Sequence, residues 1–214
     1  MSRIFRRALI ASAAGALCLV SLQAWAGAPT EQIKGSIEQV IRIVQDPKLK
    51  RESMAGERRA AIRKEAGALF DFAETGRRVL GRHWQTLNDS QQLEFVSMFT
   101  NLLERAYISR IEQYSGEQVS YLGDSVEGES ATVRTKFAPK EGPEIPIDYR
   151  LLSRGDRWLV YDVVVEGVSL VGNYRAQFDR IMRTGSYDEL ARRMRAHQAD
   201  FSAPKGQPPR PPRS

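Results

Sequence analysis

Cysteine and histidine are almost missing from this chain, and their scarcity excludes several kinds of chemistry. Cys18 is the only cysteine among the 214 residues, and it lies in an N-terminal apolar run that we expect to be removed. The rest of the chain then has no disulfide, no thiol nucleophile and no cysteine-bound metal. His83 and His197 stand in separate segments, without the spacing of a zinc site or a catalytic triad. We therefore expect no metal site and no cofactor.

Catalytic motifs and fibrous repeats are absent as well. The sequence contains no G-x-S-x-G nucleophile motif, no phosphate-binding P-loop and no dinucleotide fingerprint. Its 16 glycines and 10 prolines are too few for a fibrous protein, and a hydrophobic content of 42% excludes a wholly disordered chain. A chain of this length supports one domain with a sizeable core.

Excess charge of one sign is confined to the two ends. The formal net charge is +6, but residues 1–26 and residues 203–214 each carry three basic side chains and no acidic one. Without these six, 26 basic side chains balance 26 acidic ones. Nucleic-acid-binding strands carry basic and aromatic side chains together on one face. Arg134 and Lys136 instead lie on the strand face opposite the apolar residues. We therefore expect no nucleic-acid partner.

The first 26 residues are typical of a secretory signal. Three arginines precede an apolar run that ends in Ala24-Trp25-Ala26, a small-x-small cleavage site. The run is shorter than the ~20 apolar residues of a membrane anchor. Leu17 stands before the cysteine where bacterial lipid attachment needs a small residue. We expect cleavage after Ala26 and a periplasmic product.

Hydrophobic periodicity predicts helices on both sides of a central strand region. Apolar residues recur at helical spacing over 33–44, and a weaker helical pattern covers 52–68. A long helix is predicted from an N-cap at Asp89, which Gln92 follows three residues later as in a capping box, to about Tyr114. After the strands, the sequence predicts a helix over 169–185 and a last helix that begins with a capping box at 186–189.

The long helix has an unusually wide apolar side. Its apolar residues cover roughly half of the circumference, against the ~100° of a helix with one buried face. Such a helix contacts apolar groups on two sides, so it is either a central core helix or part of it lines a cavity. The residues concerned are Leu93, Phe95, Val96, Phe99, Leu102, Leu103, Ala106, Tyr107, Ile111 and Tyr114.

From Gln118 the hydrophobic period changes to two, which is typical of half-buried strands. Short turns separate the alternating segments, and sequential strands with short turns pair antiparallel, so we expect a meander of about four strands. The last strand, 158–166, is apolar on both faces. Strict alternation there places Val160 and Asp162 on the same face. Asp162 is then either a general base or a buried carboxylate that holds a helix N-terminus or an arginine.

Three segments carry a resemblance to a known family. Residues 69–84 contain L-F-D-F and R-V-L-G-R-H-W, and residues 91–107 contain Q-Q-L-E-F. Residues 158–178 are the most specific, with W-L-V-Y-D-V-V-V-E-G-V-S-L-V followed by N-Y-R and Q-F. Together they resemble the MlaC family, also called the toluene-tolerance family, from about Pro29 to Phe201.

The resemblance implies an α+β fold, cystatin- or NTF2-like, in which a curved sheet and the helices enclose a deep apolar pocket. It also implies a periplasmic carrier that moves phospholipid between an outer-membrane lipoprotein complex and an inner-membrane ABC transporter with an MCE-domain subunit. Phospholipid is then cargo, and no catalytic residue is implied. We expect a monomer with one lipid-binding domain over 27–202, followed by a disordered basic, proline-rich tail over 203–214.

Eleven residues are expected on or near this pocket, although each of them would equally suit an ordinary core. They are Phe95, Phe99, Leu102, Leu103, Tyr107, Tyr149, Val160, Val168, Leu170, Tyr174 and Phe178. Two alternatives remain open at this point. One is an enzyme on an NTF2-like cone, with Asp162 as base and Tyr149 as electrophile. The other is an adaptor between envelope complexes that binds no lipid.

Overall fold

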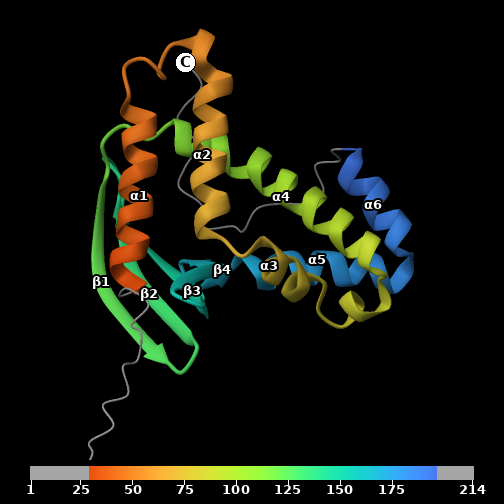
Figure 1. Cartoon of the computed structure of the whole chain (residues 1–214). Helices are drawn as coiled ribbons and strands as arrows, with labels where there is room; N and C mark the ends of the chain where they lie inside the picture. Colours follow the sequence, from red (N-terminus) through yellow and green to blue (C-terminus); the bar gives the residue numbers. More distant parts are fainter. Residues whose placement is uncertain (1–28, 197–214) are drawn as a thin grey trace, which may run out of the picture.

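The computed structural model describes residues 29–196 of the chain (Figure 1). The predicted secretory signal over 1–26 and the predicted tail over 203–214 lie outside the described residues. The elements in chain order are α1 (Pro29–Gln45), η1 (Glu52–Met54), α2 (Ala55–Leu69), α3 (Phe72–Leu80), η2 (Gly81–Thr86), α4 (Asp89–Glu112), β1 (Gln118–Glu127), β2 (Ser130–Ala138), β3 (Ile145–Arg154), β4 (Arg157–Val165), β5 (Val168–Ser169), α5 (Leu170–Thr184) and α6 (Tyr187–Arg195).

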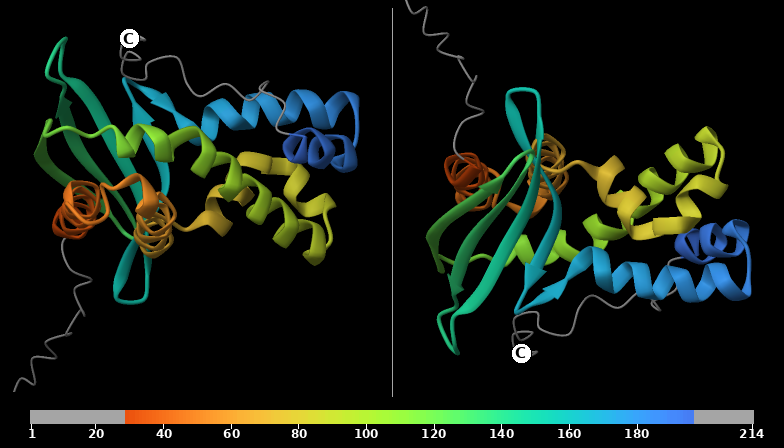
Figure 2. Two further views of the ribbon diagram at one scale, coloured as in Figure 1. Left: turned by 90° about the horizontal axis from the view of Figure 1, so that it is seen from above. Right: turned by 90° about the horizontal axis from the view of Figure 1, so that it is seen from below.

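The strands form one antiparallel sheet in which each strand pairs with the next along the chain. Gly128 and Gly155 adopt positive φ in the tight turns before β2 and β4, a conformation that glycine reaches without steric cost. The two-residue β5 extends the predicted four-strand meander by a short pairing with β4. Figure 2 shows a curved sheet. The predicted α+β fold is confirmed.

One face of the sheet packs against the two N-terminal helices. Ile33 of α1 and Leu69 of α2 form a buried cluster with Val133, Leu151 and Val160 of the strands. The helical spacing of α1 and the two-residue spacing of the strands put these side chains on facing surfaces. Figure 1 shows α1 and α2 next to each other beside β1 and β2. We call β1–β5 with α1 and α2 the sheet part.

A bulge in β4 changes which side chains share a face. Leu151 of β3 pairs with Val160, whereas the preceding Arg150 pairs with Asp162, so Tyr161 is an extra residue in β4. Directly opposed residues of an antiparallel pair share a face, and neighbours along a strand do not. Val160 and Asp162 therefore point to opposite faces. The expectation that they share one was wrong, because hydrophobic alternation alone does not reveal a bulge.

The four helices α3 to α6 form a second part, the helical part, whose core is aromatic. Phe95 and Phe99 of α4 stack with ring centroids 5.8 Å apart. Tyr174 and Phe178 of α5 meet Phe99 edge-on at centroid distances of 5.2 and 5.8 Å. All four rings are fully buried, and Leu190 of α6 belongs to the same cluster. α4 extends from this part towards the sheet (Figures 1 and 2).

The N-cap of α4 is Asn88 and not the predicted Asp89. The Asn88 side chain accepts a hydrogen bond from the backbone N–H of Gln91 at 2.9 Å, and the Gln91 side chain accepts one from the backbone N–H of Asn88 at 3.0 Å. Gln92, which the prediction paired with Asp89, instead donates to two backbone carbonyls of the preceding turn. Tertiary hydrogen bonding thus decides between two adjacent capping boxes.

Every described α-helix carries charged side chains. α4 is the longest, with 24 residues, and its charged side chains lie before Phe95 and after Leu103. Within residues 29–196, no helix combines the length and apolar character that crossing a membrane requires.

Candidate functional site

The structure divides the eleven predicted pocket residues among several places. Tyr149 and Val160 belong to the core of the sheet part. Tyr107 is half-buried on α4, and Val168 is 38% exposed in β5. The other seven lie in the cluster of the helical part or pack against it, namely Phe95, Phe99, Leu102, Leu103, Leu170, Tyr174 and Phe178.

The two best-defined hollows among the described residues lie elsewhere. The larger is an open groove of about 620 Å³ beside α3 and α5, bordered by Arg82, Arg175 and Arg183 among others. The smaller, of about 400 Å³, lies on the surface of α5. None of the eleven residues lines either hollow. Their assignment to an apolar pocket therefore stays a prediction.

Packing along α4 changes after Leu102. The buried residues of this helix are Phe95, Phe99 and Leu102, and none follows them. α4 also has few close neighbours on the sheet. We call residues 89–102 the proximal half and residues 103–112 the distal half. The apolar side chains of the distal half remain half-buried, namely Leu103, Ala106, Tyr107, Ile108 and Ile111.

Tyrosines of the sheet lie near the end of the distal half. Burial raises the pKa of Tyr149 to about 12, and Tyr121 adds to the rise. Burial also raises the pKa of Tyr121 to about 12, with contributions from Glu38 and from Tyr114, two residues beyond the end of α4. Both hydroxyls therefore stay protonated at neutral pH. The end of α4 thus approaches a part of the sheet whose tyrosines carry no charge.

Ion pairs to α2 hold the distal half on its other side. Arg58 and Arg59 contact Glu112 at 2.8 and 3.1 Å, and Arg63 contacts Glu104 at 2.7 Å. Burial raises the pKa of Glu112, but the hydrogen bonds of Arg59 and Arg58 outweigh it and leave this pKa lowered. The distal half is therefore held mainly by charges, whereas close packing holds the proximal half.

A buried carboxylate joins the sheet to α5. Asp162 contacts Arg150 at 3.1 Å, accepts the Ser169 hydroxyl at 2.7 Å and accepts the backbone N–H of Val171 at 3.0 Å. This confirms the expectation of a carboxylate that holds a helix N-terminus and an arginine. Tyr149 neighbours Arg150 in β3 and so points to the other face of the sheet. The base and the electrophile of the enzyme alternative are not brought together.

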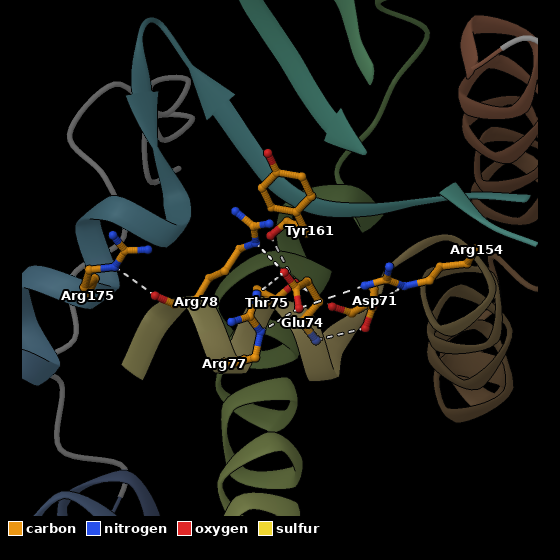
Figure 3. A network of polar contacts seen from close by, with 8 residues as sticks. All are labelled: Asp71, Glu74, Thr75, Arg77, Arg78, Arg154, Tyr161 and Arg175. Carbon is orange, nitrogen blue, oxygen red and sulfur yellow. Dashed lines mark hydrogen bonds and ion pairs between the residues drawn. The ribbon is translucent and has the colours of Figure 1, made fainter. Parts of the chain in front are cut away.

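A second buried carboxylate organises the start of α3 (Figure 3). Glu74 is 9% exposed and contacts Arg77 at 2.7 Å and Arg78 at 2.6 Å. The hydrogen bond from Arg77 and that from Arg78 lower the pKa of Glu74 to about 2, against the opposing effect of burial. Asp71 caps α3 by accepting the Glu74 backbone N–H at 2.9 Å, and it contacts Arg154 of β3 at 3.1 Å.

The same network reaches β4 and α5. The guanidinium of Arg78 lies over the Tyr161 ring, 3.9 Å from its centroid, and the Thr75 hydroxyl donates to the Tyr161 carbonyl at 3.1 Å. Arg175 of α5 donates to the Arg78 carbonyl at 2.8 Å. Figure 3 shows these residues in one continuous set. These contacts of α3 therefore fix the helical part to the sheet, in addition to the contacts by which Asp162 fixes α5.

The sequence reasoning missed Arg110 of α4. The residue is half-buried, but its Nη1 atom is inaccessible to solvent and has no hydrogen-bond partner. A usable signal was present, because Arg110 follows Leu103 by seven residues and so falls within the wide apolar side of the helix. Within residues 29–196, no group of histidine, cysteine or carboxylate side chains is arranged to bind a metal.

Comparison with known proteins identifies the family. A family model described as MlaC protein matches residues 34–196, which is more than half of the chain. The chain belongs to the MlaC family. The resemblance carried by the residue 158–178 segment is thereby confirmed.

Two known proteins resemble the chain. The intermembrane phospholipid transport system binding protein MlaC of Haemophilus influenzae is 22% identical over 141 residues, which cover 64% of this chain and 66% of that protein, slightly less than two thirds of its length. A phospholipid-binding protein of Ralstonia solanacearum, whose structure was solved in complex with a phospholipid, shares 23% identity and a TM-score of 0.70, with 81% of this chain and 98% of that chain covered. This likeness shows a common fold.

Proposed function

We propose that this protein is a periplasmic phospholipid carrier that holds acyl chains between the distal half of α4 and the sheet. The observation that carries the proposal is the change in packing along α4. Its apolar distal residues are left half-buried in a fold shared with a protein that was solved with phospholipid. Family membership supports the same cargo, since the Haemophilus influenzae relative is named for phospholipid transport.

The energetics of lipid transfer explain why a carrier is needed. Two acyl chains contain about 30 methylene groups, and exposing each to water costs ~0.8 kcal/mol, or about 24 kcal/mol in total. Spontaneous transfer through water is therefore very slow. A carrier must cover most of this surface, and incompletely packed apolar side chains such as Leu103 and Ile111 provide matching surface.

Loading and release require a conformational change. The proximal half is fixed by its aromatic core, so movement of the distal half away from the sheet is the expected route. A lipid bound equally by all states would not be handed on, so partners must stabilise an open state. The proposed partners are the inner-membrane MCE-domain subunit of an ABC transporter and an outer-membrane lipoprotein complex, each meeting a monomeric carrier exported after cleavage at Ala26.

Lipid extraction tests this function directly. The protein is purified from the periplasm, extracted with organic solvent and analysed by mass spectrometry. We expect phospholipid in the wild type and in Leu93→Asp, whose side chain on the proximal half is 74% exposed. We expect little in Leu103→Asp, which puts the same charge on the distal half. Wild-type protein without phospholipid, as an adaptor or an unrelated enzyme would be, contradicts the proposal.

A further inference from the structure

Basic side chains gather around the two hollows on the surface of the helical part. The hollows, of about 620 and 400 Å³, share Asp179 and Arg183 and so adjoin each other along α5. The larger is also bordered by Arg82 of η2 and by Arg175, and the smaller by Arg180. We call the two hollows together the arginine groove. Four arginines border it, and Asp179 is the one acidic residue among its bordering side chains.

Asp179 does not neutralise the arginines of its own helix. It lies four residues from Arg175 and four from Arg183, a spacing at which helical side chains commonly pair. Its carboxylate instead contacts Arg82 at 2.8 Å and His83 at 2.9 Å, both on η2. The hydrogen bond with His83 and the charge of Arg82 lower the pKa of Asp179. This carboxylate is therefore ionised and already engaged.

The arginines of α5 consequently lack acidic partners. In the part of the chain that the structure describes, no carboxylate lies within ion-pair distance of Arg175, Arg180 or Arg183. The arginines of the neighbouring α6, in contrast, all pair with Glu189 or with Glu94. The body of the protein is balanced in charge overall, so the groove is a local excess of positive charge.

Arg175 is held in place while most of its guanidinium stays available. Its Nε atom donates to the Arg78 carbonyl at 2.8 Å, as Figure 3 shows. Gly81 adopts positive φ at the start of η2, and a Cβ atom at this position would lie 3.8 Å from the Arg175 Nε atom. A guanidinium that is already oriented loses less conformational freedom when it pairs with a carboxylate, and it pairs through two parallel hydrogen bonds.

A recessed group of cations suits an acidic chain better than a bilayer surface. The walls of a groove concentrate the field of the charges that border it. An extended segment with aspartate or glutamate side chains can place carboxylates inside such a recess, whereas a bilayer is flat on this scale. Binding to a membrane surface also uses exposed apolar side chains. Leu80, which borders the groove, is only 2% exposed, and Ala176 offers a single methyl group.

We propose that the arginine groove binds an acidic segment of a protein partner, with Arg175 and Arg183 pairing with its carboxylates. The inference rests on the proposed carrier function for its setting, in which envelope complexes supply and receive the lipid. No residue of the distal half of α4 borders the groove. Docking and cargo binding therefore use different surfaces of the protein, and each can be tested without the other.

A charged peptide probes the groove. Fluorescence anisotropy measures binding of a decapeptide that alternates glutamate and serine, and the control peptide has glutamine in place of glutamate. We expect the wild type to prefer the glutamate peptide and its affinity to fall as salt is added, because these charges are exposed. Arg183→Gln should weaken binding by about two- to fivefold, the range for one exposed ion pair, and Arg175→Gln with Arg183→Gln by about tenfold. The basic residues 203–214 also attract this peptide, so the loss in the variants is the measure of the groove.

Arg51→Gln is the matched control. Arg51 is also exposed, and its Nε atom likewise donates to a backbone carbonyl, that of Lys48 at 3.2 Å. This variant should bind the glutamate peptide like the wild type. Arg183 makes no such bond within residues 29–196, so Arg183→Gln should keep the thermal unfolding temperature of the wild type and decides the test if Arg175→Gln unfolds.

The contrary outcomes separate the groove from the carrier function. Unchanged affinity in the double variant, equal binding of the glutamine peptide, or no binding by the wild type each overturns the inference and leaves the carrier function intact. Phosphatidylglycerol vesicles that bind more tightly than the peptide, through the same two arginines, would assign the groove to a membrane surface and also overturn it. Co-purified phospholipid should be equal in all these variants, and its absence from the wild type would contradict the carrier function alone.

Discussion

The two halves of α4 belong to one regular helix but are held by different forces. Phe95 and Phe99 in the proximal half are fully buried in an aromatic cluster with α5. The distal half contains no buried residue, and its firmest contacts are the ion pairs of Glu104 and Glu112 with α2. Hydrophobic packing resists separation throughout, whereas an ion pair with an exposed partner contributes less and is replaced by water at lower cost, as for the half-exposed Arg59 and Arg63.

This contrast indicates a division of labour within one element. The proximal half fixes the helix to a rigid part of the molecule, supported by the Glu74 network and by Asp162. The distal half leaves apolar side chains available and is restrained by groups that water can also satisfy. A carrier needs both properties, because its fold must survive while its cargo enters and leaves.

Truncation of the proximal core should have the largest effect on stability. Phe99→Ala removes a fully buried ring, so we expect the free energy of unfolding to fall by about 3–5 kcal/mol. Denaturant titration measures this change. If Phe99→Ala lowers the free energy of unfolding by less than an equivalent truncation in the distal half, the proximal half is not the more tightly packed one.

Loss of the buried Glu74 carboxylate in α3 should have the second-largest effect on stability. The pKa of Glu74 is lowered to about 2 in the folded protein from an ordinary 4.5. Its stabilisation is therefore complete above about pH 4.5 and is lost as the pH falls towards 2. We expect Glu74→Gln to cost on the order of 2–3 kcal/mol at neutral pH. The difference from wild type should shrink in denaturation experiments at decreasing pH, and a constant difference would contradict this assignment.

Truncation in the distal half should lower stability less than truncation in the proximal half, but it should reduce the amount of bound lipid. Leu103→Ala removes a half-buried side chain, so we expect a loss of ~1–2 kcal/mol, below the range for a fully buried leucine. The amount of co-purified phospholipid, measured by mass spectrometry, should fall severalfold. Unchanged lipid content in Leu103→Ala would argue that the chains lie elsewhere.

The smallest expected stability effect is that of the ion pairs to α2. Glu104→Gln weakens the contact with Arg63, whose side chain is 56% exposed, and should cost about 1 kcal/mol. Because this change frees the distal half, transfer of fluorescent phospholipid to acceptor vesicles should become faster. Glu57→Gln, at an exposed position of α2, serves as the matched control. Slower or unchanged transfer in Glu104→Gln would show that this pair does not restrain opening.

Local periodicity was sufficient for the other main helices, the four longer strands and their order, but it did not predict α3. The apolar spacing around Ile33 and the alternation in β2 and β3 follow directly from which side chains must be buried. The switch of faces in β4 was missed, because the extra residue Tyr161 is set by pairing with β3 and leaves the strand equally apolar. The N-cap of α4 was misplaced by one residue because Asn88 and Asp89 both precede a glutamine at the right spacing.

The site was less accessible to sequence reasoning than the fold. A wide apolar side on α4 was recognised, but the sequence could not divide it into a packed and an open half, since that depends on how α5 and the sheet approach the helix. Phe99 and Leu103 both lie on the apolar side predicted from the sequence, yet Phe99 is buried and Leu103 is half-buried. Arg110 was overlooked because a cation in an apolar pattern is ordinarily taken as solvent-exposed, and only the structure reveals that its Nη1 atom is enclosed.

Hydrogen exchange along α4 tests the central claim most directly. Exchange of backbone amides is compared between empty protein and protein loaded with phosphatidylglycerol, with loading verified by mass spectrometry. We predict that protection of residues 103–112 rises by about tenfold or more on loading, while residues 89–102 change little. Equal protection of both halves, or no change over 103–112 in protein that demonstrably carries lipid, would contradict the account.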